Sequence, residues 1–527
     1  MEWTREQRYR RLEDITGKEY EELMESVNSC MYRQKYHIQP KTGLLNDPNG
    51  FSYYNGEYHI FYQWFPIGPV HGIKYWYHMV SKDLVHWEDK GIGLSPDTEY
   101  ESHGVFSGSG FVKDDLLYLF YTGNTRDKDW IRKPYQCLAT MDKCGNINKY
   151  NKPLIIDSPK GYTDNFRDPN VFEQNGYYYC LIGAENINNE GKIVYYRSKD
   201  LFDWELMGEV DVPYKGGFMW ECPDYFEIDN KGIIMFCSQG QEKSGNEYNN
   251  IFPSGYILTD KIDFSNPVVT SNIYTEFDRG FDFYAPQTMK DNKGRRILIG
   301  WLGLPGIECV TEKNNWAHCL TLPRELIIKN DRLYQRPISE LDNIKYNPVT
   351  ISDTIKGTAQ FDGFEGDIYY LNCKFTDIIG EKVGVKLRVG DNEETLFYYD
   401  TLNSELVFDR SNSGIQYAVE YGSIRKCSFN EKQLQLEIFM DSSSIEIFVN
   451  DGLEVFTSRI YAKKESCGIE FFADNSANID ATIYDIRLSH NKVLLIKNTT
   501  IVLYIWYYFF LYICGVYPYI FLNLRIK

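Results

Sequence analysis

Five short segments of the sequence repeat one pattern at a spacing of roughly 60 residues, and this repeat constrains the fold more than any other feature. In each segment the second residue is Pro or Gly and the fifth is Phe or Met. The segments are residues 47–51, 107–111, 168–172, 222–226 and 285–289. A repeat of this length predicts one structural unit that is used five times.

Each segment is followed by a turn and by runs of β-branched or aromatic residues. Asn55-Gly56 and Asn175-Gly176 supply the positive φ angles that a tight hairpin turn requires. Later in two of the units the phrase Ser-Lys-Asp-Leu recurs, at residues 81–84 and 198–201. Four short strands per unit, repeated five times without helical spacing between them, favour an all-β fold with a five-bladed β-propeller.

The rest of the chain divides into three further parts. Residues 1–33 are charged and loosely amphipathic, which is typical of surface helices. The propeller is expected over residues 34–342 and a β-sandwich over residues 343–490, where short alternating strands are separated by Asn-Asp-Gly and Asp-Ser-Ser turns. Two roles stay open for the sandwich: it covers an edge of the propeller, or it forms a homodimer contact.

The last part, residues 491–527, is a hydrophobic tail. Its run 501–522 carries no charge and is long enough to cross a bilayer, but it is crowded with Tyr and Phe and interrupted by Pro518. A membrane anchor, a buried accessory segment and a tail without function all stay open. The opposite end has no apolar stretch that could serve as a signal peptide, so a cytoplasmic location is expected.

Charge and cysteine content exclude several classes of function. The chain has a formal net charge of −18, which argues against a nucleic-acid partner because such binding depends on Lys and Arg neutralising phosphates. Its 12 Cys include no C-x-x-C pair, so neither a zinc site nor a redox motif is indicated. No metal site is expected.

Three acidic residues occupy matched places in the repeat. Asp47 and Asp168 are the first residues of their segments, and Glu221 precedes the first residue of its own. Because the innermost strand of each blade lines the propeller axis, these carboxylates are expected to meet there. One step along a strand reverses the side-chain direction, so Glu221 requires a β-bulge next to Pro223 to face the same way.

Carboxylates gathered at one point repel each other, which raises the proton affinity of at least one of them. A glycosidase needs this arrangement, with one acid protonated to assist the leaving oxygen and another ionised to attack the sugar. A single Asp before Pro is more often a turn residue, but three acids at matched positions favour catalysis.

Other residues are candidates for contacts with a sugar at the same axis. Trp76 and Trp301 are candidates for stacking on a sugar face, although a buried Trp belongs as readily to the core. Hydrogen-bonding groups suited to sugar hydroxyls are carried by Asn46, Gln63, Ser107 and Arg167.

At these residues the chain resembles the invertase-type glycoside hydrolases, family 32. The matching stretches are residues 45–50, 106–109, 166–169, 220–223 and 282–287, and the resemblance runs from Tyr36 to Leu488. It implies hydrolysis of a β-fructoside through a fructosyl-enzyme, with Asp47 as nucleophile, Glu221 as acid/base and Asp168 as stabiliser of the transition state. It also implies that no metal or organic cofactor is needed. The implied lining of the fructosyl pocket is Asn46, Gln63, Phe106, Ser107 and Arg167.

Within the family, residues 42–45 and 65–76 resemble the bacterial enzymes that hydrolyse sucrose 6-phosphate. A cytoplasmic location agrees with this substrate, because sucrose phosphorylated during uptake appears inside the cell. His71 and Lys74 are the candidate phosphate ligands, and the alternative is that they are rim residues facing water. Unphosphorylated sucrose and fructans are alternative substrates, and a catalytically silent carbohydrate-binding propeller is the alternative of another class.

Overall fold

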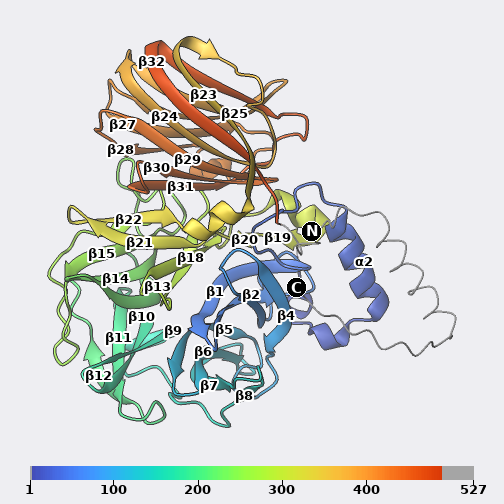
Figure 1. Ribbon diagram of the computed structural model, residues 1–527. Helices are drawn as coiled ribbons and strands as arrows, with labels where there is room; N and C mark the ends of the chain where they lie inside the picture. Colours follow the sequence, from blue (N-terminus) through green and yellow to red (C-terminus); the bar gives the residue numbers. More distant parts are fainter. Residues whose placement is uncertain (1–2, 489–527) are drawn as a thin grey trace, which may run out of the picture. The chain divides into compact units, whose positions relative to one another are not determined.

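The computed structural model describes residues 3–488 of the 527, and these consist mainly of β-strands (Figure 1). Five sheets of four or five strands form a β-propeller, and a sixth sheet of ten strands forms a second domain. The predicted fold class is therefore confirmed. The predicted tail at residues 491–527 lies outside the described residues, and within residues 3–488 no helix is long and apolar enough to cross a membrane.

The blades follow one another along the chain, and neighbouring strands within each blade are antiparallel. Blade I contains β1 (Gly43–Tyr54), β2 (Glu57–Phe65), β3 (Tyr75–Ser81) and β4 (Trp87–Leu94). Blade II contains β5 (Val105–Lys113), β6 (Leu116–Arg126), β7 (Arg132–Met141) and β8 (Ile147–Lys149). Blade III contains β9 (Tyr162–Gln174), β10 (Tyr177–Asn186), β11 (Gly191–Ser198) and β12 (Glu205–Glu209).

Blade IV contains β13 (Met219–Ile228), β14 (Lys231–Gln239), β15 (Ser254–Asp260) and β16 (Thr275–Glu276). Blade V contains β17 (Tyr284–Lys290), β18 (Arg296–Leu302), β21 (Arg324–Lys329) and β22 (Arg332–Pro337), with β20 (Cys319–Leu320) beside β18. The ring is closed by β19 (Trp316–Ala317), which pairs in parallel with β1 of blade I. A strand late in the chain thus holds the first blade against the last.

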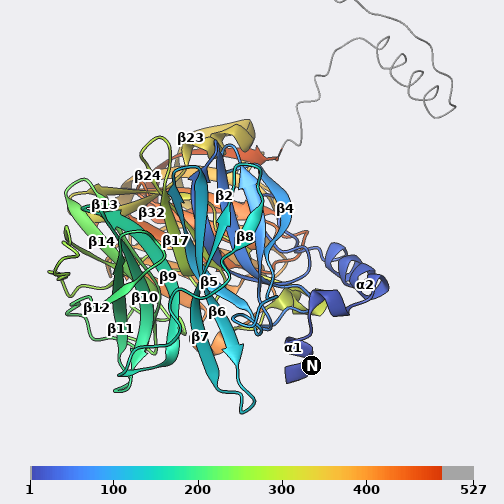
Figure 2. The ribbon, with the colours of Figure 1, turned by 90° about the horizontal axis from the view of Figure 1, so that it is seen from below.

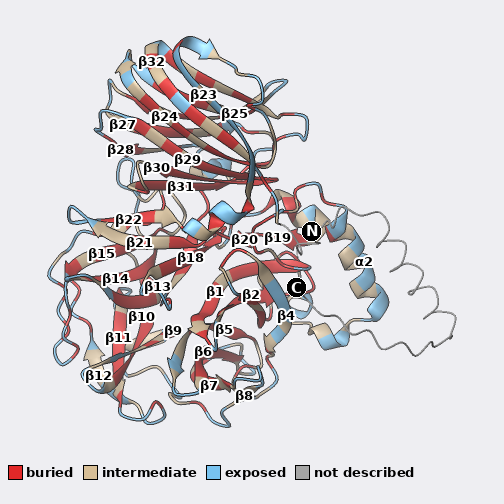
Figure 3. Ribbon diagram, viewed as in Figure 1, coloured by how far each residue is buried: buried red, intermediate tan, exposed pale blue. Residues whose placement is uncertain are grey.

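Hydrophobic cores lie between adjacent blades, which explains why the middle strands are buried on both faces (Figure 3). One core joins blades I and II around Phe61, Trp76 and Tyr121, and the next joins blades II and III around Phe120 and Ile182. This packing leaves the innermost strands β1, β5, β9, β13 and β17 in contact around the axis.

All five innermost strands contain a β-bulge at nearly the same place in the repeat, where two of their residues face one residue of the second strand. In blades III, IV and V the bulge begins at the first residue of the segment. Asp168, Cys222 and Ala285 have left-handed φ angles of 69°, 50° and 45° there. In blades I and II it begins one residue earlier, at Asn46 and Phe106. The two groups of blades therefore differ by one residue in register.

Two short α-helices and a 3₁₀ turn precede the propeller and lie beside its first blade (Figures 1 and 2). They are α1 (Arg5–Arg8), η1 (Leu12–Asp14) and α2 (Gly17–Asn28). A threonine precedes each helix as its N-cap, Thr4 for α1 and Thr16 for α2. Its side chain accepts a hydrogen bond from the backbone N–H of the third residue of the helix. Further 3₁₀ turns are η2 (Val310–Asn314), η3 (Ser339–Ile344) and η4 (Val419–Tyr421).

The second domain is one long sheet that folds over its own core. Its strands are β23 (Lys345–Ala359), β24 (Tyr369–Ile379), β25 (Lys382–Gly390), β26 (Glu393–Asp400), β27 (Glu405–Asn412), β28 (Ile424–Ser428), β29 (Leu434–Asp441), β30 (Ser444–Val449), β31 (Glu454–Arg459) and β32 (Gly468–Ile486). β27 and β31 lie near opposite ends of the strand order, yet the rings of Phe408 and Phe456 are 6.1 Å apart. The sheet therefore closes into the two layers of a sandwich.

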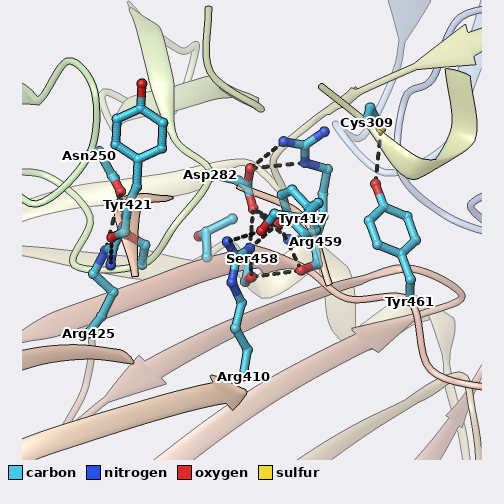
Figure 4. A network of polar contacts seen from close by, with 12 residues as sticks. Asn250, Asp282, Cys309, Arg410, Tyr417, Tyr421, Arg425, Ser458, Arg459 and Tyr461 are labelled. Carbon is cyan, nitrogen blue, oxygen red and sulfur yellow. Dashed lines mark hydrogen bonds and ion pairs between the residues drawn. The ribbon is translucent and has the colours of Figure 1, made fainter. Parts of the chain in front are cut away.

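Charged side chains join the propeller to the sandwich (Figure 4). Asp282, just before β17, accepts hydrogen bonds from Nε and Nη2 of Arg459 at 2.9 and 2.7 Å, and from the hydroxyl of Tyr417 at 2.5 Å. Arg324 on β21 bonds both Asp278 and Glu446. Every one of these charged groups is almost completely buried, so the junction depends on their pairing.

Candidate active site

The three predicted acids lie on the innermost strands of blades I, III and IV. The bulge expected next to Pro223 is present, because the pairing of β13 with β14 shifts between Glu221 and Asp224. The one-residue difference between blades I–II and III–V also decides which repeat position faces the site. Asp47 and Ser107, the first residues of their segments, hydrogen-bond each other across blades I and II. In blades III to V it is the preceding residues that meet.

Asp47 is held by neutral hydrogen-bond donors. Its Oδ2 accepts from the hydroxyl of Ser107 at 2.5 Å, and its Oδ1 accepts from the amide of Asn46 at 3.0 Å. Gln63 orients both donors, because its Nε2 donates to Ser107 at 2.6 Å and its Oε1 accepts from Asn46 at 2.9 Å. The carboxylate is thus fixed in position by neutral groups, and it forms no ion pair with any of residues 3–488.

Glu221 receives donors from three other strands. Nε and Nη2 of Arg167 donate to its Oε1 at 2.9 and 2.7 Å. Its Oε2 accepts from the Tyr284 hydroxyl and from Gln239 Nε2, both at 2.6 Å. Arg167, Glu221 and Tyr284 hold the same place in the repeat, immediately before the bulges of blades III, IV and V.

Asp168 lies between these two groups. Asp168 has a left-handed backbone, and its Oδ2 accepts from the backbone N–H of Cys222 at 3.0 Å. The bulge of blade IV thus orients the acid of blade III. Its own backbone N–H donates to the hydroxyl of Thr122 at 2.9 Å. Beside Asp168, the cavity also lined by Gly108, Pro223 and Gln287 has a volume of about 10 Å³, which is room for about one water molecule. Protein atoms therefore fill most of the propeller axis next to Asp168.

Burial and neighbouring carboxylates raise the pKa of two of the three acids, Asp168 and Asp47. Burial raises the pKa of Asp168 to about 7; the charge of Arg167 opposes this shift, whereas the charges of Glu221 and Asp47 add to it. Burial also raises the pKa of Asp47, against the hydrogen bond from Ser107, and the Glu221 charge again adds to the rise. The structure thus gathers three acids around one guanidinium, and the raised pKa values of Asp47 and Asp168 are typical of sites of acid/base and nucleophilic chemistry.

Residues 37–337 match the model of the glycosyl hydrolases family 32 N-terminal domain, and residues 340–488 match that of the family 32 C terminal. The chain belongs to glycosyl hydrolase family 32. It is 44% identical over 489 residues to a sucrose-6-phosphate hydrolase of Staphylococcus xylosus, which covers 92% of this chain and 99% of that one.

Two solved family 32 structures resemble the chain over most of its length. The sucrose-6-phosphate hydrolase from Lactobacillus gasseri has a TM-score of 0.87 and 37% sequence identity, and the match covers 92% of this chain and 99% of that one. A family 32 β-fructofuranosidase of Bombyx mori has a TM-score of 0.76 and 29% identity, over 89% of this chain and 97% of that one. The chain is accordingly a glycoside hydrolase.

The two predicted tryptophans of this family 32 site lie inside the protein. Trp76 is fully buried in the core between blades I and II, where its Nε1 donates to the carbonyl of Phe106 at 3.1 Å. Trp301 is also buried, with its ring edge-on to Tyr284. Both rings are thus largely enclosed by protein, and their stacking on a sugar face stays a prediction. Phe106 is a bulge residue beside Ser107, next to the polar pocket.

The predicted phosphate ligands His71 and Lys74 are also placed differently from expectation. Lys74 is buried behind Asn46 and donates to its Oδ1 at 2.7 Å, and burial lowers the pKa of its ammonium to about 7. Burial, together with the charges of Lys74 and Arg8, lowers the pKa of His71 well below its usual range. The ammonium of Lys74 is thus already used by Asn46, and phosphate binding by His71 and Lys74 stays a prediction.

Three groups around the acids are not among the predicted site residues. Tyr284 had a usable signal, because it holds the same repeat position as Arg167 and Glu221. Gln239 had none, since it comes from the second strand of blade IV and reaches Glu221 only through the pairing of β13 with β14. The backbone N–H of Cys222 became a ligand of Asp168 only through the left-handed bulge.

Proposed function

We propose that this chain hydrolyses sucrose 6-phosphate to fructose and glucose 6-phosphate with retention at the fructosyl carbon. The observation that carries the proposal is the contrast between Asp47, held by Ser107 and Asn46 without an ion pair, and Glu221, held by Arg167 and Tyr284. One carboxylate is held by neutral hydrogen-bond donors in a polar pocket, and the other lies among groups that can position a proton donor. The Staphylococcus xylosus and Lactobacillus gasseri relatives support the phosphorylated substrate.

In the first step Asp47 attacks the anomeric carbon of the fructosyl unit while Glu221 gives its proton to the glycosidic oxygen. The carbon–oxygen bond to the leaving sugar breaks, and a fructosyl ester of Asp47 forms. In the second step Glu221, now a carboxylate, takes a proton from water as that water attacks the same carbon and releases Asp47. Asp168, oriented by the Cys222 N–H, accepts hydrogen bonds from fructosyl hydroxyls and stabilises the positive charge of the transition state.

The remaining pocket residues position these groups. Asn46, Gln63 and Ser107 fix the nucleophile and leave polar edges for fructosyl hydroxyls. Arg167 fixes Glu221, and Lys74 holds Asn46 from behind. This proposal uses protein side chains and water alone.

The test is fructose release by the purified full-length protein from sucrose 6-phosphate and from sucrose. We expect a higher kcat/KM for the phosphorylated sugar, and an Asp47→Ala loss of about 10⁴-fold or more, because the covalent route is removed. Asp115→Ala, at an exposed turn of blade II, is the matched control and should keep full activity. Equal rates for Asp47→Ala and the unmodified protein would refute the mechanism, and sugar binding without turnover would favour a silent binding module.

Unphosphorylated sucrose is the alternative substrate. It is suggested by the family 32 β-fructofuranosidase of Bombyx mori, which is 29% identical to this chain and was solved as a mutant in complex with sucrose. A kcat/KM for sucrose equal to or above that for sucrose 6-phosphate would assign this chain to unphosphorylated sugars. Fructan oligomers tested in the same assay would separate a fructanase from an invertase.

A further inference from the structure

We infer that Arg126 and Arg132, at the loop joining β6 to β7 in blade II, bind the phosphoryl group of the leaving sugar. The inference rests on the proposed function and replaces His71 and Lys74 with a different pair of cations. It assigns substrate selection to a loop outside the five repeated segments.

The first observation is that two arginines, Arg126 and Arg132, lie opposite each other without a neutralising carboxylate among the described residues. Arg126 ends β6 and Arg132 begins β7, and the two are direct partners across the hairpin ladder. Directly opposed residues project their side chains from the same face of a sheet, and like charges in such a pair are destabilising. In a protein with a net charge of −18, an acidic neighbour would be simple to supply, yet neither arginine has a carboxylate within ion-pair distance among residues 3–488.

The second observation is that most donors of the two guanidinium groups are unused. One nitrogen of Arg126, Nη1, donates to the carbonyl of Trp130 at 3.2 Å, and Nη1 of Arg132 donates to Oδ1 of Asn165 at 2.9 Å. The Nε atoms of both side chains are buried without any acceptor in the described chain. Four other arginines of the described chain, Arg324, Arg336, Arg388 and Arg459, also have one such nitrogen. Arg126 and Arg132 differ because they oppose each other across one strand pair, and this arrangement calls for an explanation. An oxyanion with several acceptor oxygens supplies one, since guanidinium groups bind phosphate through parallel hydrogen bonds.

The third observation places the pair on the leaving-group side of the site. Oδ1 of Asn165 accepts from Nη1 of Arg132 and also from Nη1 of Arg167, each at 2.9 Å. Arg167 in turn holds Glu221, the proposed proton donor to the glycosidic oxygen. The arginine pair is therefore joined through Asn165 to the residue that holds the proposed proton donor, and we place the leaving sugar on this side of Glu221. Burial and the charges of Arg167 and Arg126 lower the pKa of Arg132 to about 10, so it remains a cation at neutral pH while bearing the repulsion.

The N-terminal segment supports this loop. The rings of Tyr9, His103 and Trp130 lie in mutual contact, with centroids 5.1 to 5.2 Å apart, and the guanidinium of Arg5 lies 4.0 Å from the Trp130 ring centre. Trp130 has a left-handed φ of 66°, which aims its carbonyl at Arg126. Residues before the propeller thus hold the arginine loop in one conformation, and a preorganised loop loses little entropy when it binds an anion.

The test compares Arg126→Gln, Arg132→Gln and the double variant with the unmodified full-length protein. We expect kcat/KM for sucrose 6-phosphate to fall roughly 10- to 100-fold in each single variant, because a charge-assisted hydrogen bond is lost, while kcat/KM for sucrose stays unchanged. Lys133→Gln, at an exposed neighbour of Arg132, is the matched control and should alter neither value. Arg132→Lys should give an intermediate loss, because the charge stays but the planar fork is gone.

A second readout does not depend on turnover of the substrate. Glucose 6-phosphate should inhibit the unmodified protein more strongly than glucose, and the two arginine variants should lose that difference. Unchanged melting temperatures of the variants would show that they fold, as expected when like charges are removed from one face.

The outcomes separate the two proposals. If the unmodified protein prefers sucrose 6-phosphate and the arginine variants keep that preference, the arginine assignment is overturned while the proposed function stands. If the unmodified protein shows no preference and no stronger inhibition by glucose 6-phosphate, both are overturned. Equal losses on sucrose and on sucrose 6-phosphate would assign the arginines a role in positioning Glu221 through Asn165 and would also overturn phosphate binding.

Discussion

Acidic side chains gather at the propeller axis and at the junction with the sandwich, and their surroundings differ in these two regions. At the junction, Asp282 is bound by Arg459, while Asp278 and Glu446 share Arg324 at 3.0 and 2.7 Å. At the axis, three acids have one arginine in contact, and it bonds Glu221 alone.

The protonation equilibria follow from that difference. Burial alone would raise the pKa of every one of these carboxyls. At the junction the charges of Arg459 and Arg410 outweigh burial and lower the pKa of Asp282, and Arg324 with His37 does the same for Glu446. Asp278 is an exception whose pKa stays raised. At the axis nothing outweighs burial for Asp47 and Asp168. Paired acids hold domains together, whereas underpaired acids retain the reactivity that catalysis requires.

The largest expected effect comes from the axis. Asp168→Asn should reduce fructose release by about 10⁴-fold, equivalent to roughly 5 kcal/mol of transition-state stabilisation. Its melting temperature should equal or exceed that of the unmodified protein, because the neutral amide still accepts from the Cys222 N–H and no longer repels Glu221. Activity assays and calorimetry on the same preparation check both. A clear loss of thermal stability would place Asp168 with the structural acids and remove the contrast.

The next effect comes from the junction. Arg324→Met should lower the free energy of unfolding by about 3 to 5 kcal/mol, because Asp278 stays buried without its cation and Glu446 keeps only its contact with His37. The fraction that remains folded should keep its kcat. Arg197→Met, which removes the exposed pair with Glu205 on blade III, is the control and should lower the free energy of unfolding by about 1 kcal/mol or less. Chemical denaturation measures both, and similar losses in the two variants would contradict the importance of the buried pairing.

The smallest effect depends on pH. His37 lies between Asp441 and Glu446, at 2.8 and 3.2 Å; burial opposes its charge, but the two carboxylates raise the pKa of its imidazole to about 9. A raised pKa stabilises the folded protein below the usual histidine pKa of about 6.5, and this contribution disappears as the pH rises through 9. His37→Gln should therefore be less stable than the unmodified protein by roughly 3 kcal/mol at pH 6, with the gap closing by pH 10. A gap that does not change with pH would show that His37 acts through packing alone.

Much of the site followed from the repeat. Five equivalent segments predicted five blades, and equivalent positions predicted that Asp47 and Asp168 would approach one axis. Even the offset of Glu221 led to the bulge beside Pro223, because strand geometry allows few other ways to turn that side chain inward. Tyr284 was within reach of the same reasoning, since it matches Glu221 in the repeat.

Residues outside the repeat were predicted less well. Trp76 and Lys74 lie on or beside the third strand of blade I, and alternation along that strand leaves two faces to choose from. Packing determines which face each side chain occupies. Trp76 packs against Tyr121 of blade II, and Lys74 donates to Asn46 on the first strand of its own blade. Arg126 and Arg132 became opposed only through the hairpin register of β6 and β7. These contacts depend on strand register and on packing between strands, so the local sequence pattern does not predict them.

Read alone, the sequence settles which acids this protein has and that one repeat carries them, because five copies of one local pattern must adopt one local structure. It does not settle their chemistry. Glu221 accepts from a guanidinium, Asp47 from a hydroxyl and Asp168 from a backbone N–H, and all three donors come from other blades. Burial at the axis strengthens each of these contacts. Proton affinity is a property of that three-dimensional neighbourhood, and only the folded chain creates it.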